Sequence, residues 1–158
     1  MKPADIFLAD DHELFRKGIR ALLEDHQNWR IVGEASNGRE AVEKIVKLKP
    51  DIAILDVGMP EMNGLEATRQ IMALLPSTRV LILTMHESEQ LVREVLSAGA
   101  RGYVLKSDPG TSLISAIQAL LDNKSFLASS LSDVVVETYL KQKEPAPLTK
   151  GVLTTRGT

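Results

Sequence analysis

Residues 52–56 read Ile52-Ala53-Ile54-Leu55-Asp56, four apolar residues followed directly by a carboxylate, and this run gives the clearest indication of the fold. An unbroken apolar run of this kind is typical of a strand whose two faces are both covered, as in a parallel sheet. Four similar runs occur elsewhere in the chain, at residues 6–9, 31–32, 80–83 and 103–105. Together the five runs predict five strands of a buried parallel sheet.

Helical patterns lie between the predicted strands. Apolar residues recur there at i, i+4 and i+7, the spacing that lines one face of a helix. This spacing predicts helices near residues 15–23, 41–48, 91–98 and 113–121. Strand and helix therefore alternate through residues 5–123, which predicts an α/β fold with a doubly wound parallel sheet and helices on both faces.

Helix-start signals agree with this alternation. Asn37 and Asn63 each stand three residues before a glutamate, the spacing at which the two side chains cap a helix start reciprocally. Asp108-Pro109 has the order of an N-cap followed by the first helical residue. These signals predict helices that begin after Asn37, after Asn63 and after Asp108.

The composition excludes several classes of function. The 158 residues include 19 Lys and Arg, 21 Asp and Glu, and no Cys, for a net charge of −2. The lack of Cys excludes thiol catalysis and Cys-ligated zinc, and the small charge gives no electrostatic reason to expect nucleic-acid binding. No apolar run approaches the roughly 20 residues that span a bilayer. We therefore expect a soluble, cytoplasmic protein with no membrane partner.

Polar side chains follow four of the five predicted strands. They are Asp10, Asp11, Asp56, Thr84 and Lys106. Carboxyl ends of parallel strands meet at one edge of a sheet, where ligands of open α/β folds bind. A single Asp after a strand is more often a helix cap, but four polar strand ends together favour a site. Three carboxylates favour Mg²⁺, and a lysine and a hydroxyl suit phosphate oxygens, so the set predicts a phosphoryl site.

Other site motifs are missing from the sequence. There is no glycine-rich phosphate loop and no dinucleotide fingerprint after the first predicted strand. No Ser–His–Asp set can be identified. His12, His26 and His86 follow no metal-ligand spacing, so we expect each of them in a solvated loop or helix.

The polar strand ends also form a family pattern. It reads Asp10-Asp11, then Asp56 with Met59-Pro60 and Gly64, then Thr84 and Lys106. This pattern resembles the receiver domain of two-component response regulators over about residues 5–123. Segments 83–86 and 99–106 are similar to the NarL/FixJ branch, whose output is a LuxR-type helix-turn-helix. The resemblance implies a flavodoxin-like (βα)5 fold with strand order 2-1-3-4-5.

The resemblance assigns a chemical role to each carboxylate. It implies that Asp56 is the phosphoacceptor, which attacks the phosphohistidine of a sensor histidine kinase and becomes an acyl phosphate. It implies that Asp11 binds Mg²⁺ directly, that Asp10 does so mainly through water, and that Asp56 and the Gly58 carbonyl are further ligands. Beyond this self-catalysed transfer and slow autodephosphorylation, no enzyme activity is expected.

The resemblance also implies a switch. Lys106 would pair with the phosphate, Thr84 would move toward it, and Tyr103 would follow by swinging inward. The charge that a phosphoryl group adds, roughly 1.5 to 2 units, can pull a nearby hydroxyl and ammonium into place. Homodimerisation on phosphorylation is a further expectation.

The end of the chain reads differently from the alternating part. We expect a receiver domain over 1–124, one further helix over 125–141, and a linker with the start of a truncated helix-turn-helix domain over 142–158. Val152-Leu153-Thr154-Thr155-Arg156 is similar to the opening of a LuxR-type domain. On this interpretation, DNA binding belongs to the missing C-terminal domain.

Two other functions stay open at the level of sequence. A stand-alone receiver that acts on a protein target would use the same residues. A Mg²⁺-dependent phosphohydrolase with Asp56 as nucleophile is a weaker alternative, because such enzymes often carry an acid two residues beyond the nucleophile, where this chain has Gly58.

Overall fold

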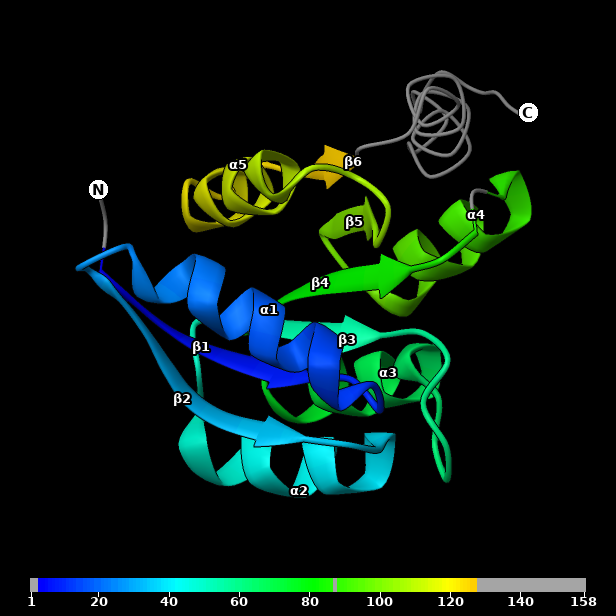
Figure 1. Ribbon diagram of the computed structural model, residues 1–158. Helices are drawn as coiled ribbons and strands as arrows, with labels where there is room; N and C mark the ends of the chain where they lie inside the picture. Colours follow the sequence, from blue (N-terminus) through cyan, green and yellow to red (C-terminus); the bar gives the residue numbers. More distant parts are fainter. Residues whose placement is uncertain (1–2, 87, 128–158) are drawn as a thin grey trace, which may run out of the picture.

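The computed structural model describes residues 3–86 and 88–127, which form a parallel sheet with helices on both faces (Figure 1). The sheet has six strands in the order β2-β1-β3-β4-β5-β6. The predicted order of the first five strands is therefore confirmed, and β6 extends the sheet at its edge. The strands are β1 (Ala4–Ala9), β2 (Trp29–Ala35), β3 (Ile52–Asp56), β4 (Arg79–Thr84), β5 (Gly102–Leu105) and β6 (Phe126–Leu127).

Five helices connect the strands, and they divide between the two faces of the sheet. α1 and α5 cover one face, and α2, α3 and α4 cover the other (Figure 1). Within the described residues, none of these helices is long and apolar enough to cross a membrane. The helices are α1 (Glu13–Glu24), α2 (Gly38–Leu48), α3 (Gly64–Leu74), α4 (Glu89–Ala98) and α5 (Gly110–Leu121).

The unbroken apolar runs are explained by the two covered faces. In β1, Ile6 and Leu8 pack against α1 and α5, whereas Phe7 packs on the opposite face with α2 and α3. All three side chains are fully buried. Because neither face of the strand meets water, no position in the run favours a polar residue.

The predicted helix caps are confirmed at two positions and wrong at a third. The side chains of Asn37 and Asn63 each accept a hydrogen bond from the backbone N–H three residues on, at 2.8 and 2.9 Å. The N-cap of α5 is Pro109 rather than Asp108. The Asp108 carboxylate instead accepts a hydrogen bond from the Leu105 N–H at 3.0 Å. Asp108 therefore closes the turn after β5 and does not cap the helix.

The helix predicted over 125–141 is wrong at its start. Asn123 adopts a φ of 61° just after α5, and the chain then returns to the sheet, where Phe126 and Leu127 form β6 parallel to β5. These two side chains pack against opposite faces of the sheet, as alternating strand residues do. The rest of that predicted helix, and the segment 142–158, lie outside the described residues.

Two glycines provide a matched test of this packing. A Cβ on Gly38 would lie 1.9 Å from the Met62 carbonyl oxygen, whereas a Cβ on Gly18, on the exposed side of α1, would meet nothing within 4 Å. We expect Gly38→Ala to lower the free energy of unfolding by about 1–3 kcal/mol through overpacking. Gly18→Ala should raise it by roughly 0.5–1 kcal/mol, because alanine favours the helix. Urea unfolding of both variants measures the contrast, and equal effects would contradict the packing described here.

Candidate functional site

The carboxyl ends of β1, β3, β4 and β5 meet at one edge of the sheet (Figure 1). The Lys106 ammonium lies 2.7 Å from Asp10 Oδ2 and 3.4 Å from Asp56 Oδ1. Asp11 follows Asp10 and contributes a further carboxylate to the same cluster. The structure thus brings together four of the five polar residues that follow the predicted strands, from segments almost a hundred residues apart.

The charged groups of this cluster are largely buried. Asp10 is fully buried, Asp56 is 4% exposed, and the Lys106 side chain is 7% exposed. Burial, and then the neighbouring Asp10 carboxylate, raise the pKa of Asp56 above its usual value of 3.8. The Lys106 ammonium and the Gly58 N–H, which donates to the Asp56 carboxylate, act against this rise. One ammonium therefore compensates two buried carboxylates only in part.

The donor set fits a hard divalent cation. One ligand atom each from Asp10, Asp11, His12 and Asp56 can be chosen so that all lie within 4.8 Å of one another. The buried Asp10 Oδ2 accepts no hydrogen bond, although the Lys106 ammonium is its close ion-pair partner. A cluster of carboxylate oxygens of this kind suits Mg²⁺, a hard cation that prefers oxygen ligands. Gly58 is exposed beside this cluster, and the role of its carbonyl as a ligand stays a prediction.

His12 belongs to the site although the sequence analysis assigned it no role. Its ring is 60% exposed, in agreement with a solvated position, but Nδ1 faces inward, 3.2 Å from Asp10 Oδ1 and 3.3 Å from Asp11 Oδ1. Its backbone N–H also donates to Asp10 Oδ1 at 2.8 Å. Its position directly after the two aspartates was the signal that could have identified it. By contrast, His26 stacks on Trp29 and lies beyond the other end of α1 from His12.

Arg16 is a second residue that the sequence analysis missed. Its guanidinium donates to the Asp10 carbonyl oxygen, and its Nε lies 3.2 Å from Glu34 Oε1 on β2. Glu34 also pairs with Arg20. Arg16 therefore fixes the backbone that carries Asp10, one helical turn after His12. Nothing in the apolar spacing of α1 distinguishes this arginine from a solvated one.

Thr84 and Tyr103 meet at the backbone of His86. The Thr84 hydroxyl accepts a hydrogen bond from the His86 N–H at 3.2 Å and donates to the His86 carbonyl at 3.4 Å. The Tyr103 hydroxyl donates to the same carbonyl at 3.1 Å, and its ring is fully buried. In this structure Tyr103 already lies inward, while Thr84 is bonded to its own loop rather than to the carboxylates. Movement of either side chain stays a prediction.

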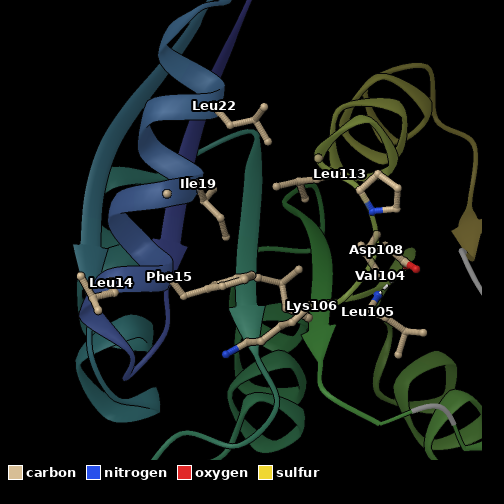
Figure 2. Close-up of a pocket in the computed structure, with 13 residues that line it drawn as sticks. Leu14, Phe15, Ile19, Leu22, Val104, Leu105, Lys106, Asp108 and Leu113 are labelled. Atoms are coloured by element: carbon tan, nitrogen blue, oxygen red, sulfur yellow. Dashed lines mark hydrogen bonds between the residues drawn. The ribbon is translucent and has the colours of Figure 1, made fainter.

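An apolar surface adjoins the charged cluster. Phe15 of α1 lies with its ring centroid 4.7 Å from the Lys106 ammonium, and Figure 2 shows the two side chains extending toward each other. Phe15 and Met85 border a cavity of about 390 Å³ at this edge. A second cavity of about 260 Å³ lies between α1 and the start of α5, with Leu14, Ile19 and Leu113 among its walls (Figure 2). The cluster is thus flanked by exposed apolar side chains.

Comparison with known proteins identifies the family. The family model of the response regulator receiver domain matches residues 6–118, so the chain belongs to the response regulator receiver family. The predicted resemblance is therefore confirmed.

The relatives lie in the LuxR branch. The chain is 38% identical to the response regulator UvrY of Escherichia coli (strain K12) over 141 residues, 89% of this chain and 63% of that protein. It is 34% identical to the transcriptional regulatory protein DegU of Brevibacillus brevis over 134 residues, 85% of this chain and 57% of that protein. The chain thus spans about three-fifths of the length of these curated relatives.

Solved structures support the same assignment. A two-component response regulator of the LuxR family from Aurantimonas sp. SI85-9A1 superposes with a TM-score of 0.81 at 34% identity, over 88% of this chain and 99% of that one. The signal receiver domain of the putative response regulator NarL from Mycobacterium tuberculosis gives a TM-score of 0.74 at 33% identity, over 78% and 100% of the two chains. The described part of the chain is a LuxR-family receiver domain.

Proposed function

We propose that this receiver domain is switched by phosphorylation of Asp56 and relays the signal to a LuxR-type DNA-binding domain outside this chain. The observation that carries the proposal is the position of the Lys106 ammonium, 3.4 Å from Asp56 Oδ1 and 2.7 Å from Asp10 Oδ2. The positive charge of Lys106 is thereby held where a phosphoryl group on Asp56 would add negative charge. The phosphodonor is the phosphohistidine of a sensor histidine kinase.

The transfer forms one bond and breaks another. An Asp56 carboxylate oxygen attacks the phosphorus, the P–N bond to the donor imidazole breaks, and Asp56 becomes an acyl phosphate. Asp10, Asp11 and Asp56 would hold Mg²⁺, which supplies positive charge to the phosphoryl oxygens when it is bound. Lys106 orients the phosphate by a charge-assisted hydrogen bond. Arg16 keeps the Asp10 backbone in place through its bond to the Asp10 carbonyl.

The switch acts through Thr84. A phosphoryl oxygen competes with the His86 backbone for the Thr84 hydroxyl, because a charged acceptor makes a stronger hydrogen bond than a carbonyl. The Tyr103 hydroxyl bonds to the same His86 carbonyl at 3.1 Å. When the Thr84 hydroxyl leaves the His86 carbonyl, the loop after β4 is released from Thr84. The hydrogen bond between that carbonyl and the Tyr103 hydroxyl then changes as well. The β4–α4 side of the domain thereby reports the state of Asp56.

Relatives support the proposed output. DegU is described as a transcriptional regulatory protein. RcsB has been solved as two dimers bound to two parallel DNAs, and that chain superposes with a TM-score of 0.77 at 29% identity, over 69% of its length. By analogy, we place the receiver at 1–124 and assign DNA binding to a C-terminal domain, with homodimerisation following phosphorylation.

Labelling with a small acyl-phosphate donor tests the proposal. After incubation with the donor and Mg²⁺, intact mass should show one added phosphoryl group per chain. Hydroxylamine, which cleaves acyl phosphates, should remove it. A chain that gains no mass would contradict the proposal. Steady release of inorganic phosphate from a phosphate ester over many turnovers would favour the phosphohydrolase alternative instead.

The surface that meets the kinase can be tested separately. The donor imidazole must reach Asp56, so the kinase covers the apolar rim of the site, where the Leu14 side chain is 84% exposed. We expect Leu14→Asp to slow transfer from a kinase that phosphorylates the wild-type chain by about tenfold or more. Labelling by the small donor should be unchanged. The control is Leu74→Asp, since Leu74 is 58% exposed at the end of α3. Equal slowing of transfer in both variants would contradict the proposal that the kinase contacts the rim at Leu14.

A further inference from the structure

The candidate metal site contains a nitrogen as well as carboxylate oxygens. His12 Nδ1 lies 3.2 Å from Asp10 Oδ1 and 3.3 Å from Asp11 Oδ1. It also lies 3.3 Å from the Lys106 ammonium. One ligand atom from each of His12, Asp10, Asp11 and Asp56 falls within a set no more than 4.8 Å across. The imidazole nitrogen is therefore part of the same cluster of atoms as the carboxylate oxygens that would hold a cation.

These separations suit neighbouring ligands of a single ion. In an octahedral shell with ligands about 2.1 Å from the ion, adjacent ligand atoms are about 3.0 Å apart. The separations of Nδ1 from the Asp10 and Asp11 oxygens, 3.2 and 3.3 Å, are close to this value. The arrangement is also fixed in advance, because the His12 N–H holds Asp10 Oδ1 at 2.8 Å. His12 is the N-cap residue of α1, so the start of the helix fixes its backbone conformation.

The partners of Nδ1 place incompatible demands on it. Toward a carboxylate, Nδ1 must donate a proton, whereas toward an ammonium it must offer its lone pair, because a lysine ammonium has only donors. A single nitrogen cannot satisfy both kinds of partner. A cation between Nδ1 and the carboxylates would accept the lone pair and the carboxylate oxygens together. The local geometry is consequently better suited to the ion-bound arrangement.

We propose that His12 is a further metal ligand through Nδ1, and that it shifts the site away from Mg²⁺ and toward divalent transition-metal cations such as Co²⁺ and Mn²⁺. The inference rests on the proposed metal site at Asp10, Asp11 and Asp56. Carboxylates suit Mg²⁺ and Mn²⁺, but imidazole adds affinity for transition metals and little for Mg²⁺. The protein would then bind Co²⁺ or Mn²⁺ more tightly relative to Mg²⁺ than an all-oxygen site does.

Electron spin-echo spectroscopy with Mn²⁺ alone tests the ligand directly. A coordinated imidazole gives ¹⁴N modulation of the Mn²⁺ signal, which carboxylate and water ligands do not. We expect this modulation in the wild-type chain and its loss in His12→Gln. It should persist in the matched control His26→Gln, whose ring stacks on Trp29 away from the site. Circular dichroism checks the fold of His12→Gln, and the His12 side chain makes no capping hydrogen bond to α1.

Calorimetric titration provides the second readout. His12→Gln should weaken Co²⁺ binding by about tenfold or more, as loss of a ligand or its support does, and should leave Mg²⁺ binding nearly unchanged. Mn²⁺ that binds without ¹⁴N modulation, or modulation that survives in His12→Gln, would overturn the role of His12 and leave the carboxylate site intact. Failure of the wild-type chain to bind Mn²⁺ would overturn the metal site and this inference together. Acyl-phosphate labelling then decides the proposed function independently.

Discussion

Asp56→Asn is expected to abolish the gain of a phosphoryl group from a small acyl-phosphate donor. An amide cannot act as the nucleophile, and the neighbouring Asp10 carboxylate is poorly placed to replace it. Asp10 is fully buried and paired with Lys106 at 2.7 Å. Intact mass measures the result after equal exposure to donor and Mg²⁺.

The control for this experiment is Asp25→Asn. Asp25 is exposed at the end of α1 and is also an aspartate, so the two variants change the net charge equally. Labelling of Asp25→Asn should match that of the wild-type chain. Full labelling of Asp56→Asn would show that another residue is the phosphoacceptor, and the proposed function would then have to be reassigned.

The same substitution is expected to stabilise the fold near neutral pH. Burial and the Asp10 carboxylate raise the pKa of Asp56 above 3.8 in the folded chain. Between 3.8 and that raised pKa, the native state binds more protons than the unfolded state, so stability falls as the pH rises. Asparagine carries no charge, so Asp56→Asn removes this fall in stability with rising pH. The gain in free energy of unfolding should be complete above the raised pKa and should shrink as the pH falls toward 3.8.

Urea unfolding with a chelator present measures this pH dependence. The chelator is required because a bound cation would stabilise the ionised carboxylate. The difference between Asp56→Asn and the wild-type chain should be large at pH 7 and small at pH 4. A difference that grew toward acid pH would mean that the Asp56 carboxylate is stabilised by its surroundings, contrary to the burial described here.

The parts of the structure that could be predicted depend on repeated, local patterns. The run Ile52–Leu55 has both faces covered, so burial acts on every position and the pattern is strong. The site at the sheet edge could also be predicted, because parallel strands bring their carboxyl ends together whatever the intervening sequence. This reasoning located Asp10, Asp56 and Lys106 without any knowledge of contacts between helices.

The parts that could not be predicted depend on tertiary geometry. β6 has two residues, too few for a periodic pattern, and it forms because Phe126 and Leu127 reach opposite faces of an existing sheet. Asp108 has two competing uses, as a helix cap or as the acceptor for the Leu105 N–H, and sequence does not choose between them. The inward direction of His12 Nδ1 follows from the backbone between β1 and α1, which the sequence pattern does not specify.

Lys106→Ala is expected to have the second large effect, on stability and on the switch, while divalent cation binding persists. The Lys106 ammonium lies 2.7 Å from the buried Asp10 carboxylate. Removing one partner of a buried ion pair leaves a charge uncompensated, which costs about 3–5 kcal/mol. With chelator present, the free energy of unfolding should fall by this order, whereas Lys17→Ala, which removes a side chain 68% exposed on α1, should change it little.

Divalent cations should then recover part of the stability of Lys106→Ala, because Mg²⁺ can take over the compensation of Asp10 and Asp56. The recovery separates the two roles of Lys106, since a cation can balance the carboxylates but cannot replace the ammonium on a phosphoryl oxygen. Without that contact, phosphorylation should move the amide resonances of Thr84 and Tyr103 much less than in the wild-type chain. Calorimetry measures Mg²⁺ binding, and nuclear magnetic resonance measures the shifts of these amide resonances. Loss of all Mg²⁺ binding in Lys106→Ala would contradict this separation of roles, because the substitution leaves the carboxylate ligands of the cation in place.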